Sequence, residues 1–296
     1  MSLNKVEIVH GKLNHLAQLS PPLKMLLGEV IQQMREFLEI HSNQVKGSRK
    51  HSSREYEVNK DMKEDVKIMI AILADMRNNP LPIVVPREGP GSWALEVYTD
   101  VSGHLLDNPS LGVYSPAQGP GPALVASLAL PRGFLLARDS QGKKTFCKTI
   151  SLEALGVLAT LCLDPLRFIG KEVVFFIDNI GTVISFEKGY SKDEWTTTIV
   201  RASRVIAAAL GCFILVRWER RRSSKGSKIA DDLTHNLLEG LSGSEVESFI
   251  SLGAVSFPEA IQEWMASPGK DRSLGRRVFS WLLKEFPSLS VVIETE

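Results

Sequence analysis

Hydrophobic and polar positions follow two different periods along the chain. Over residues 12–40, and again from about 60 to 78, apolar residues recur every three or four positions, which is the period of an amphipathic helix. From residue 93 onwards the pattern changes to short apolar runs that end at turn residues, as strands do. The chain therefore predicts a helical first part and a second part that contains a sheet.

The segment NNPLPIVVPREGPGSW, residues 78–93, separates these two parts. Its proline and glycine content is typical of a linker, because both residue types interrupt helices and strands. We expect a helical domain over residues 1–80, a linker over 81–92 and a sheet-containing domain over 93–241. A helical extension whose role the sequence does not indicate follows over 242–296.

The second part begins with apolar segments that glycine- and proline-rich turns separate. The segments WALEVYTDVSG, PALVASLALP and RGFLLAR are typical of three antiparallel strands. A helical period then starts at Ser151, a candidate N-cap that would place Glu153 in the first turn. Strands at 172–178 and 212–218 alternate with helical stretches, the last of which starts near Ser227. This order predicts an α/β fold in which an antiparallel meander is followed by parallel strands.

Four carboxylates stand at the edges of these elements. Asp100 and Asp178 end apolar strands, whereas Glu153 and Asp231 lie near the starts of helices. Each acid alone would be explained as a solvated cap or an ion pair. Ligands bind at the carboxyl ends of strands in an open α/β sheet, so folding can bring the four together. Four close acids repel one another unless hard cations lie between them, and a pair of Mg²⁺ ions is an arrangement that cuts phosphodiesters.

The segments that carry these acids resemble a known family. YTDVSG, SLEALGVLATL, VVFFIDNIGTV and SKIADDLTHN are similar, in this order, to the four blocks of a ribonuclease H domain. They resemble in particular the version beside the reverse transcriptases of DIRS-type retrotransposons and their pararetrovirus relatives. The segments HGKLNHLAQLSPPLKMLLGEV and DMKEDVKIMIAIL resemble the thumb-like segment of those elements, so the resemblance covers roughly residues 6–240. It implies a ribonuclease H-like fold and hydrolysis of the RNA strand of an RNA·DNA hybrid.

The resemblance also implies roles for individual residues. Asp100, Glu153, Asp178 and Asp231 would be the catalytic residues and would bind two Mg²⁺ or Mn²⁺ ions. Asp231 and Asp232 compete for the last ligand position, and the A-D-x-L-S-R block of the family favours Asp231. Substrate contacts are expected from the first strand, from the Asp-Asn pair and from the densest basic run of the chain, because cations neutralise phosphates. These residues are Ser102, Asn179, Arg220, Arg221, Arg222 and Lys225.

Departures from the family pattern leave a second hypothesis open. The loop WERRRSSKGSK, before Asp231, lacks the histidine that many ribonucleases H carry there, and His235 stands where the family has arginine. The alternative is a catalytically inactive, ribonuclease H-like module for nucleic-acid binding or scaffolding, against which the intact acidic quartet argues. A 3′–5′ exonuclease would need an acid where Ser102 stands. An integrase would place its glutamate last, whereas Glu153 comes second.

The composition of the chain indicates its compartment and its partners rather than its activity. Lysine and arginine number 35 against 34 acids, a net charge of +1, so nucleic-acid binding would depend on local basic runs. The three cysteines lack metal-binding spacing and are typical of a reduced intracellular protein, either cytoplasmic or nuclear. No run approaches the length of a membrane span. We expect an RNA·DNA hybrid as partner, with a polymerase partner or a parent polyprotein, and no membrane.

Overall fold

The computed structural model describes residues 94–102, 110–118, 121–131, 149–252, 257–266 and 274–286, together with two helical lysines, Lys63 and Lys67. The chain divides into two compact units, Met1–Ile83 with Ser288–Glu296, and Val84–Pro287. Apart from the two lysines, every described residue belongs to the second unit. The helices expected over residues 1–80 and the expected strand RGFLLAR otherwise lie outside the described residues.

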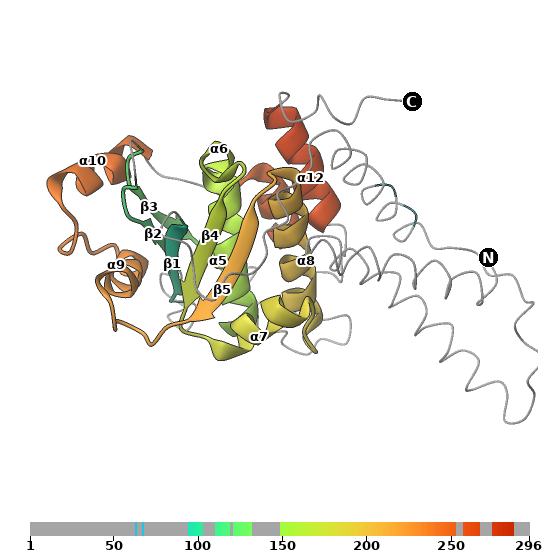
Figure 1. Ribbon diagram of the computed structural model, residues 1–296, viewed down its shortest axis with the longest axis horizontal. Coiled ribbons are helices and arrows are strands. Elements are labelled where there is room, and N and C mark those ends of the chain that lie inside the picture. The colour runs from blue at the N-terminus through green and yellow to red at the C-terminus, as the bar shows by residue number, and fades with distance from the viewer. Residues whose placement is uncertain are drawn as a thin grey trace, which may run out of the picture. The chain divides into compact units, whose positions relative to one another are not determined.

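A five-stranded mixed sheet forms the centre of the second unit (Figure 1). Strand β1 pairs antiparallel with β2, and β2 antiparallel with β3. On its other side β1 pairs parallel with β4, and β4 parallel with β5. The protein therefore has an α/β fold in which an antiparallel meander is followed by parallel strands, as the sequence predicts. In spatial order the strands are β3 (Leu124–Ala129), β2 (Ser110–Ser115), β1 (Leu95–Val101), β4 (Glu172–Ile177) and β5 (Phe213–Trp218).

Helices cover both faces of this sheet (Figure 1). Helix α5 (Thr149–Leu163) packs on one face, where Gly156 lies against Leu111. Helix α9 (Lys225–Thr234) packs on the opposite face, against Gly112, because neighbouring strand residues point to opposite sides. The other helices are α6 (Pro165–Phe168), α7 (Ile180–Lys188), α8 (Glu194–Ala209), α10 (Gly243–Leu252), α11 (Glu259–Ala266) and α12 (Leu274–Glu285).

Strand β2, SLGVYS, is the middle strand of the meander, and the sequence pattern did not predict it. Gly112 interrupts its apolar run, which weakens the local strand signal. The structure gives the reason for this glycine: a Cβ atom there would lie 2.1 Å from the carbonyl oxygen of Ala230 in α9. The missing side chain therefore lets α9 pack directly on the strand.

The start of α5 differs from the prediction. The helix begins at Thr149, so Ser151 is inside it and is not its N-cap. The Ser151 hydroxyl instead donates to Oδ2 of Asp193, at 2.9 Å, and lies 3.1 Å from the Thr196 hydroxyl. Glu153 consequently lies beyond the first turn of α5, where it is buried.

The described helices of the C-terminal segment 242–296 belong to the second compact unit. Helix α10 packs against β3, and α12 packs against α8. Leu274, Val278 and Leu282 recur every four residues along α12 and are fully buried. Among the helices that the structure describes, none is both long enough and apolar enough to cross a membrane.

Candidate active site

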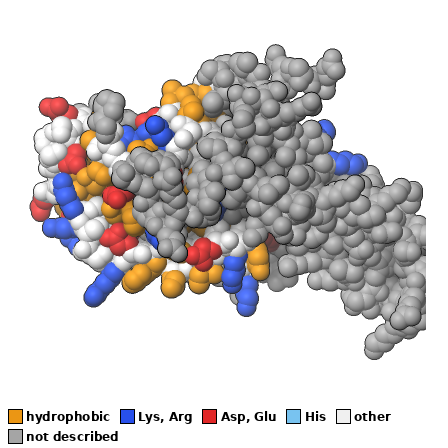
Figure 2. Space-filling view, viewed as in Figure 1, with side chains coloured by type: hydrophobic (Ala, Val, Ile, Leu, Met, Phe, Trp, Pro, Cys, Tyr) orange, Lys and Arg blue, Asp and Glu red, His pale blue; other side chains and the backbone are white. Residues whose placement is uncertain are grey.

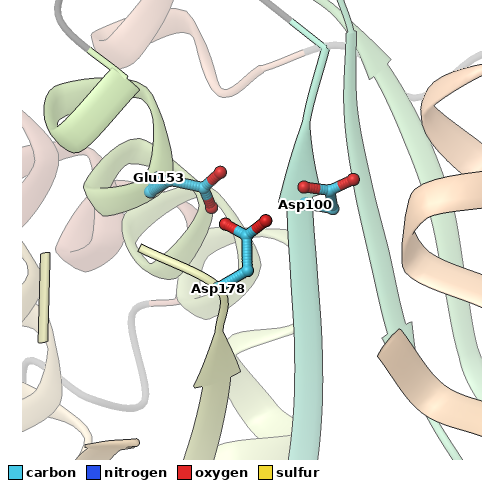
Figure 3. Close-up of side chains that lie close together, drawn as sticks. All are labelled: Asp100, Glu153 and Asp178. Carbon is cyan, nitrogen blue, oxygen red and sulfur yellow. The ribbon is translucent and has the colours of Figure 1, made fainter. Parts of the chain in front are cut away.

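Three carboxylates converge at the carboxyl edge of the sheet. Asp100 lies near the end of β1, Asp178 follows the last residue of β4, and Glu153 comes from α5. Because β1 and β4 are parallel neighbours, their carboxyl ends meet at the same edge. One carboxylate oxygen from each of the three side chains lies within 4.8 Å of the other two. Figure 3 shows the three carboxylates facing a common space; we call them the three-acid cluster.

Two acids of the three-acid cluster are buried, Asp178 is half-buried, and the cluster is incompletely hydrogen-bonded. Glu153 is 1% exposed and Asp100 is 5% exposed. Oxygen Oε2 of Glu153 has no hydrogen-bond partner among the residues that the structure describes. A buried charge without a partner is unfavourable, and carboxylate oxygens are among the hard ligands that Mg²⁺ prefers. The residues present therefore fit a divalent cation held by Asp100, Glu153 and Asp178.

Burial raises the pKa of each acid in the cluster. Loss of hydration raises the pKa of Glu153 well above its usual range, and the charges of Asp100 and Asp178 raise it further. Burial also raises the pKa of Asp178. For Asp100, burial is again the largest cause, followed by a hydrogen bond with Asp231. Without a cation, the cluster therefore retains protons at a pH where exposed carboxyl groups have lost theirs.

Asp231, the fourth predicted ligand, lies beside Asp100 but belongs to a different set of contacts. Nε of Arg221 donates to Asp231 Oδ1 at 2.8 Å, and Nη2 of the same guanidinium donates to that oxygen and to Asp100 Oδ2, the latter at 3.2 Å. Arg222 Nη1 donates to Asp231 Oδ2 and, at 2.8 Å, to Asp232 Oδ1. Burial raises the pKa of Asp231, but hydrogen bonds from Asp100, Arg221 and Arg222 outweigh this effect, so that the pKa is lowered.

The sequence predicts Arg221 and Arg222 as substrate contacts. In the structure both guanidinium groups contact the acids of β1 and α9. The sequence shows a basic run directly before Asp231, but the run has two possible partners, phosphate and carboxylate. Only the folded position of Asp100 and Asp231 decides between them. Arg220 and Lys225, the other two predicted contacts in this run, are exposed.

Ser102 and Asn179, two further predicted substrate contacts, make hydrogen bonds within the fold. The Ser102 side chain is fully buried, and its hydroxyl accepts from the backbone N–H of Ser110 at 3.2 Å and lies 3.4 Å from the carbonyl oxygen of Thr234. It therefore joins β1, β2 and the end of α9. Asn179 caps α7, because its Oδ1 accepts from the N–H of Thr182 at 3.2 Å. Its half-buried side chain lies directly after Asp178.

Trp218 is a site residue for which the sequence pattern favoured core packing over a contact in a groove. Its indole Nε1 donates to the carbonyl oxygen of Asp178 at 3.0 Å, while 53% of the residue remains exposed. The hydrogen bond fixes the backbone that presents the Asp178 carboxylate. The position of Trp218 in the sequence could have indicated a role in the site. The residue ends a strand that is parallel to β4, and it precedes the basic run. Core packing is commoner for tryptophan, so the pattern alone favoured a buried side chain.

The fold and the cluster together define a candidate metal-binding site at the carboxyl edge of a mixed α/β sheet. Comparisons of the chain with models of protein families, with curated proteins and with solved structures found no match. Function is therefore inferred from the geometry and chemistry of the residues themselves, and from the resemblance of the four sequence blocks.

Proposed function

We propose that this chain is a metal-dependent endonuclease of the ribonuclease H type, which hydrolyses the RNA strand of an RNA·DNA hybrid. The observation that carries the proposal is the buried carboxylate of Glu153, which faces those of Asp100 and Asp178 and whose Oε2 has no hydrogen-bond partner among the described residues. An antiparallel meander followed by parallel strands is also the arrangement that the ribonuclease H resemblance implies.

Three different elements supply the ligands of the proposed metal, so their relative positions are set by the core of the fold. A Mg²⁺ or Mn²⁺ ion bound by Asp100, Glu153 and Asp178 would help to activate a water and to stabilise the leaving oxygen. In the hydrolysis the water oxygen joins phosphorus while the bond to the 3′ oxygen breaks. The 3′ oxygen leaves with the electron pair and takes up a proton, and the second water proton goes to solvent.

Substrate binding would depend on a few exposed basic residues. Arg220 and Lys225 are exposed in the segment between β5 and the start of α9, so they can reach phosphates. Figure 2 shows lysine and arginine side chains scattered among acidic and hydrophobic ones on the face in view. A polymerase partner or a parent polyprotein remains an expectation from the resemblance.

One observation favours the second candidate, a ribonuclease H-like module that binds nucleic acid without cutting it. Both carboxylate oxygens of Asp231 accept hydrogen bonds from guanidinium groups. The expectation of two metal ions depends on Asp231 as a ligand, and these contacts compete with that role. The three-acid cluster remains complete without Asp231, which is why we place cleavage first.

Cleavage of a labelled RNA·DNA hybrid in Mg²⁺ or Mn²⁺ tests the proposal. We expect cleavage by the wild type and its loss in Asp178→Asn, because the amide keeps the shape of the carboxylate but weakens metal binding. Asp164→Asn is the matched control. Asp164 follows the end of α5, about 16 Å along the helix axis from Glu153 at the usual rise per residue. This variant should cleave as the wild type does.

Two other results would overturn the nuclease proposal. Cleavage that persists unchanged in Asp178→Asn would mean that another protein in the sample cuts the substrate. No cleavage, together with tight binding of the hybrid by the wild type, would instead support the binding module.

A further inference from the structure

The positively charged guanidinium group of Arg221 contacts two of the four acids, Asp100 and Asp231. Its Nη2 atom lies 3.2 Å from Asp100 Oδ2 and also contacts Asp231 Oδ1. In a two-ion site that has Asp231 as a ligand, the second cation would lie against Asp231 and its neighbour Asp100, while the three-acid cluster holds the first. The guanidinium group therefore stands where the second ion would bind.

Arg222 occupies the remaining oxygen of Asp231. Its Nη1 atom contacts Asp231 Oδ2 and lies 2.8 Å from Asp232 Oδ1. The backbone of Arg222 has a φ angle of 56°, in the left-handed region that residues other than glycine rarely adopt. The contacts with two adjacent acids of α9 hold the loop in this conformation. Asp231 therefore has no oxygen left that is free of a guanidinium contact.

The site has two parts, which differ in how far arginine side chains match the negative charges of the acids. Asp231 and Asp232 carry two negative charges, which the charges of Arg221 and Arg222 match. Among the described residues, the ion pair of the three-acid cluster is the one between Arg221 and Asp100, and Glu153 Oε2 has no hydrogen-bond partner there. The unmatched negative charge is therefore concentrated on the side of Glu153 and Asp178.

We propose that Arg221 takes the place of the second metal ion, so that the site binds a single divalent cation at Asp100, Glu153 and Asp178. The Arg221 side chain is 42% exposed, so N–H groups on its open side can donate to a non-bridging oxygen of a substrate phosphate. This inference rests on the proposed function, because it concerns which positive charges, metal ion or arginine, neutralise the acids of the same phosphodiester-binding site.

The number of ions bound per chain tests this inference without a measurement of activity. Mn²⁺ is titrated into the full chain by calorimetry, and free Mn²⁺ is counted by electron paramagnetic resonance. We expect one ion in the wild type and two in Arg221→Gln, because the variant frees Asp100 Oδ2 and Asp231 Oδ1 for a second ion. Arg217→Gln, which removes the same charge from the exposed end of β5, is the matched control and should bind one ion.

A second pair of variants tests the inference if Arg221→Gln does not fold. Asp231→Asn should still bind one Mn²⁺, with an affinity within about threefold of the wild type, a difference well below 1.4 kcal/mol. Asp178→Asn should lose the ion. Loss of an ion in Asp231→Asn would overturn the inference, since it would make Asp231 a ligand.

The remaining outcomes separate this inference from the proposed function. Two ions in the wild type would overturn the role of Arg221 and leave the nuclease proposal standing. One ion in both the wild type and a folded Arg221→Gln would also overturn it, because Arg221 would not be what excludes the second ion. No ion in the wild type would overturn both proposals together.

Discussion

Glu153 lies in α5 with 1% of its surface exposed, and its carboxylate faces Asp100 and Asp178. Burial raises its pKa, so the folded chain holds the proton more tightly than the unfolded chain does. As the pH rises above about 4, the unfolded chain releases this proton first. The free energy of unfolding therefore falls with increasing pH until the folded state also releases it. A metal ion reverses this effect, because it favours the ionised form.

The change Glu153→Gln tests this account. Without metal at neutral pH or above, we expect the variant to be more stable than the wild type by about 1–3 kcal/mol, because the neutral amide removes the cost of burying an ionised carboxylate. Urea denaturation in EDTA from pH 5 to 8 measures the difference, which should grow with pH. Added Mg²⁺ should stabilise the wild type only. Glu187→Gln, at an exposed position of α7, is the control and should behave as the wild type does.

Helix α9 is the element that brings Asp231 to the sheet, and two glycines determine how closely it packs. A Cβ atom at Gly112 would collide with the backbone of Ala230, and one at Gly226 would lie 2.4 Å from the ring of Tyr98. The helix start is fixed by a capping box, in which the Ser224 hydroxyl accepts from the N–H of Ser227. The position of Asp231 therefore depends on contacts along the whole helix.

A methyl group at Gly112 should displace α9. Because the Cβ atom would meet backbone rather than a flexible side chain, we expect Gly112→Ala to lower the free energy of unfolding by about 1–3 kcal/mol, the typical cost of overpacking. Urea denaturation gives the value. Gly243→Ala is the control, since a Cβ atom there meets nothing within 4 Å. Equal stability of the two variants would contradict the close packing of α9 on β2.

At the scale of the whole second unit, the C-terminal helices support the site through a series of contacts. Helix α12 packs on α8, and α8 packs on α5, which carries Glu153. Trp264 of α11 is 1% exposed and makes an edge contact with the ring of Trp195, at 5.1 Å between centroids. The segment after α9 is consequently needed to bury the outer face of α8.

Loss of packing at Leu282 should therefore destabilise the unit that holds the site. This residue is fully buried in α12, so we expect Leu282→Ala to lower the free energy of unfolding by about 2–5 kcal/mol. Lys284→Ala, at an exposed position of the same helix, should change it by less than about 0.5 kcal/mol. Chemical denaturation measures both. A small effect at Leu282 would show that α12 packs only weakly on α8.

The local pattern of apolar residues was sufficient to predict most strands of the sheet. The apolar runs at β1, β3, β4 and β5 have the spacing of strands, and the acids Asp100 and Asp178 stand where those runs end. The pattern did not predict β2, because Gly112 is required by α9 rather than by the strand itself. The prediction that Ser151 is the N-cap of α5 was wrong for a similar reason. The Ser151 hydroxyl forms hydrogen bonds with Asp193 and Thr196 at the start of α8 and does not cap its own helix.

The sequence by itself determined the order of the elements and the residue types at their ends, because the period of hydrophobic positions is a local property. Only the tertiary structure decided which charges meet. Arg221 and Asp100 are 121 positions apart in the chain, and the guanidinium reaches the carboxylate only because α9 packs across β1 and β2. Burial of Glu153 and of Ser102 was decided in the same way. Partner choice between charged groups depends on distance and desolvation, and both are set by packing between distant segments.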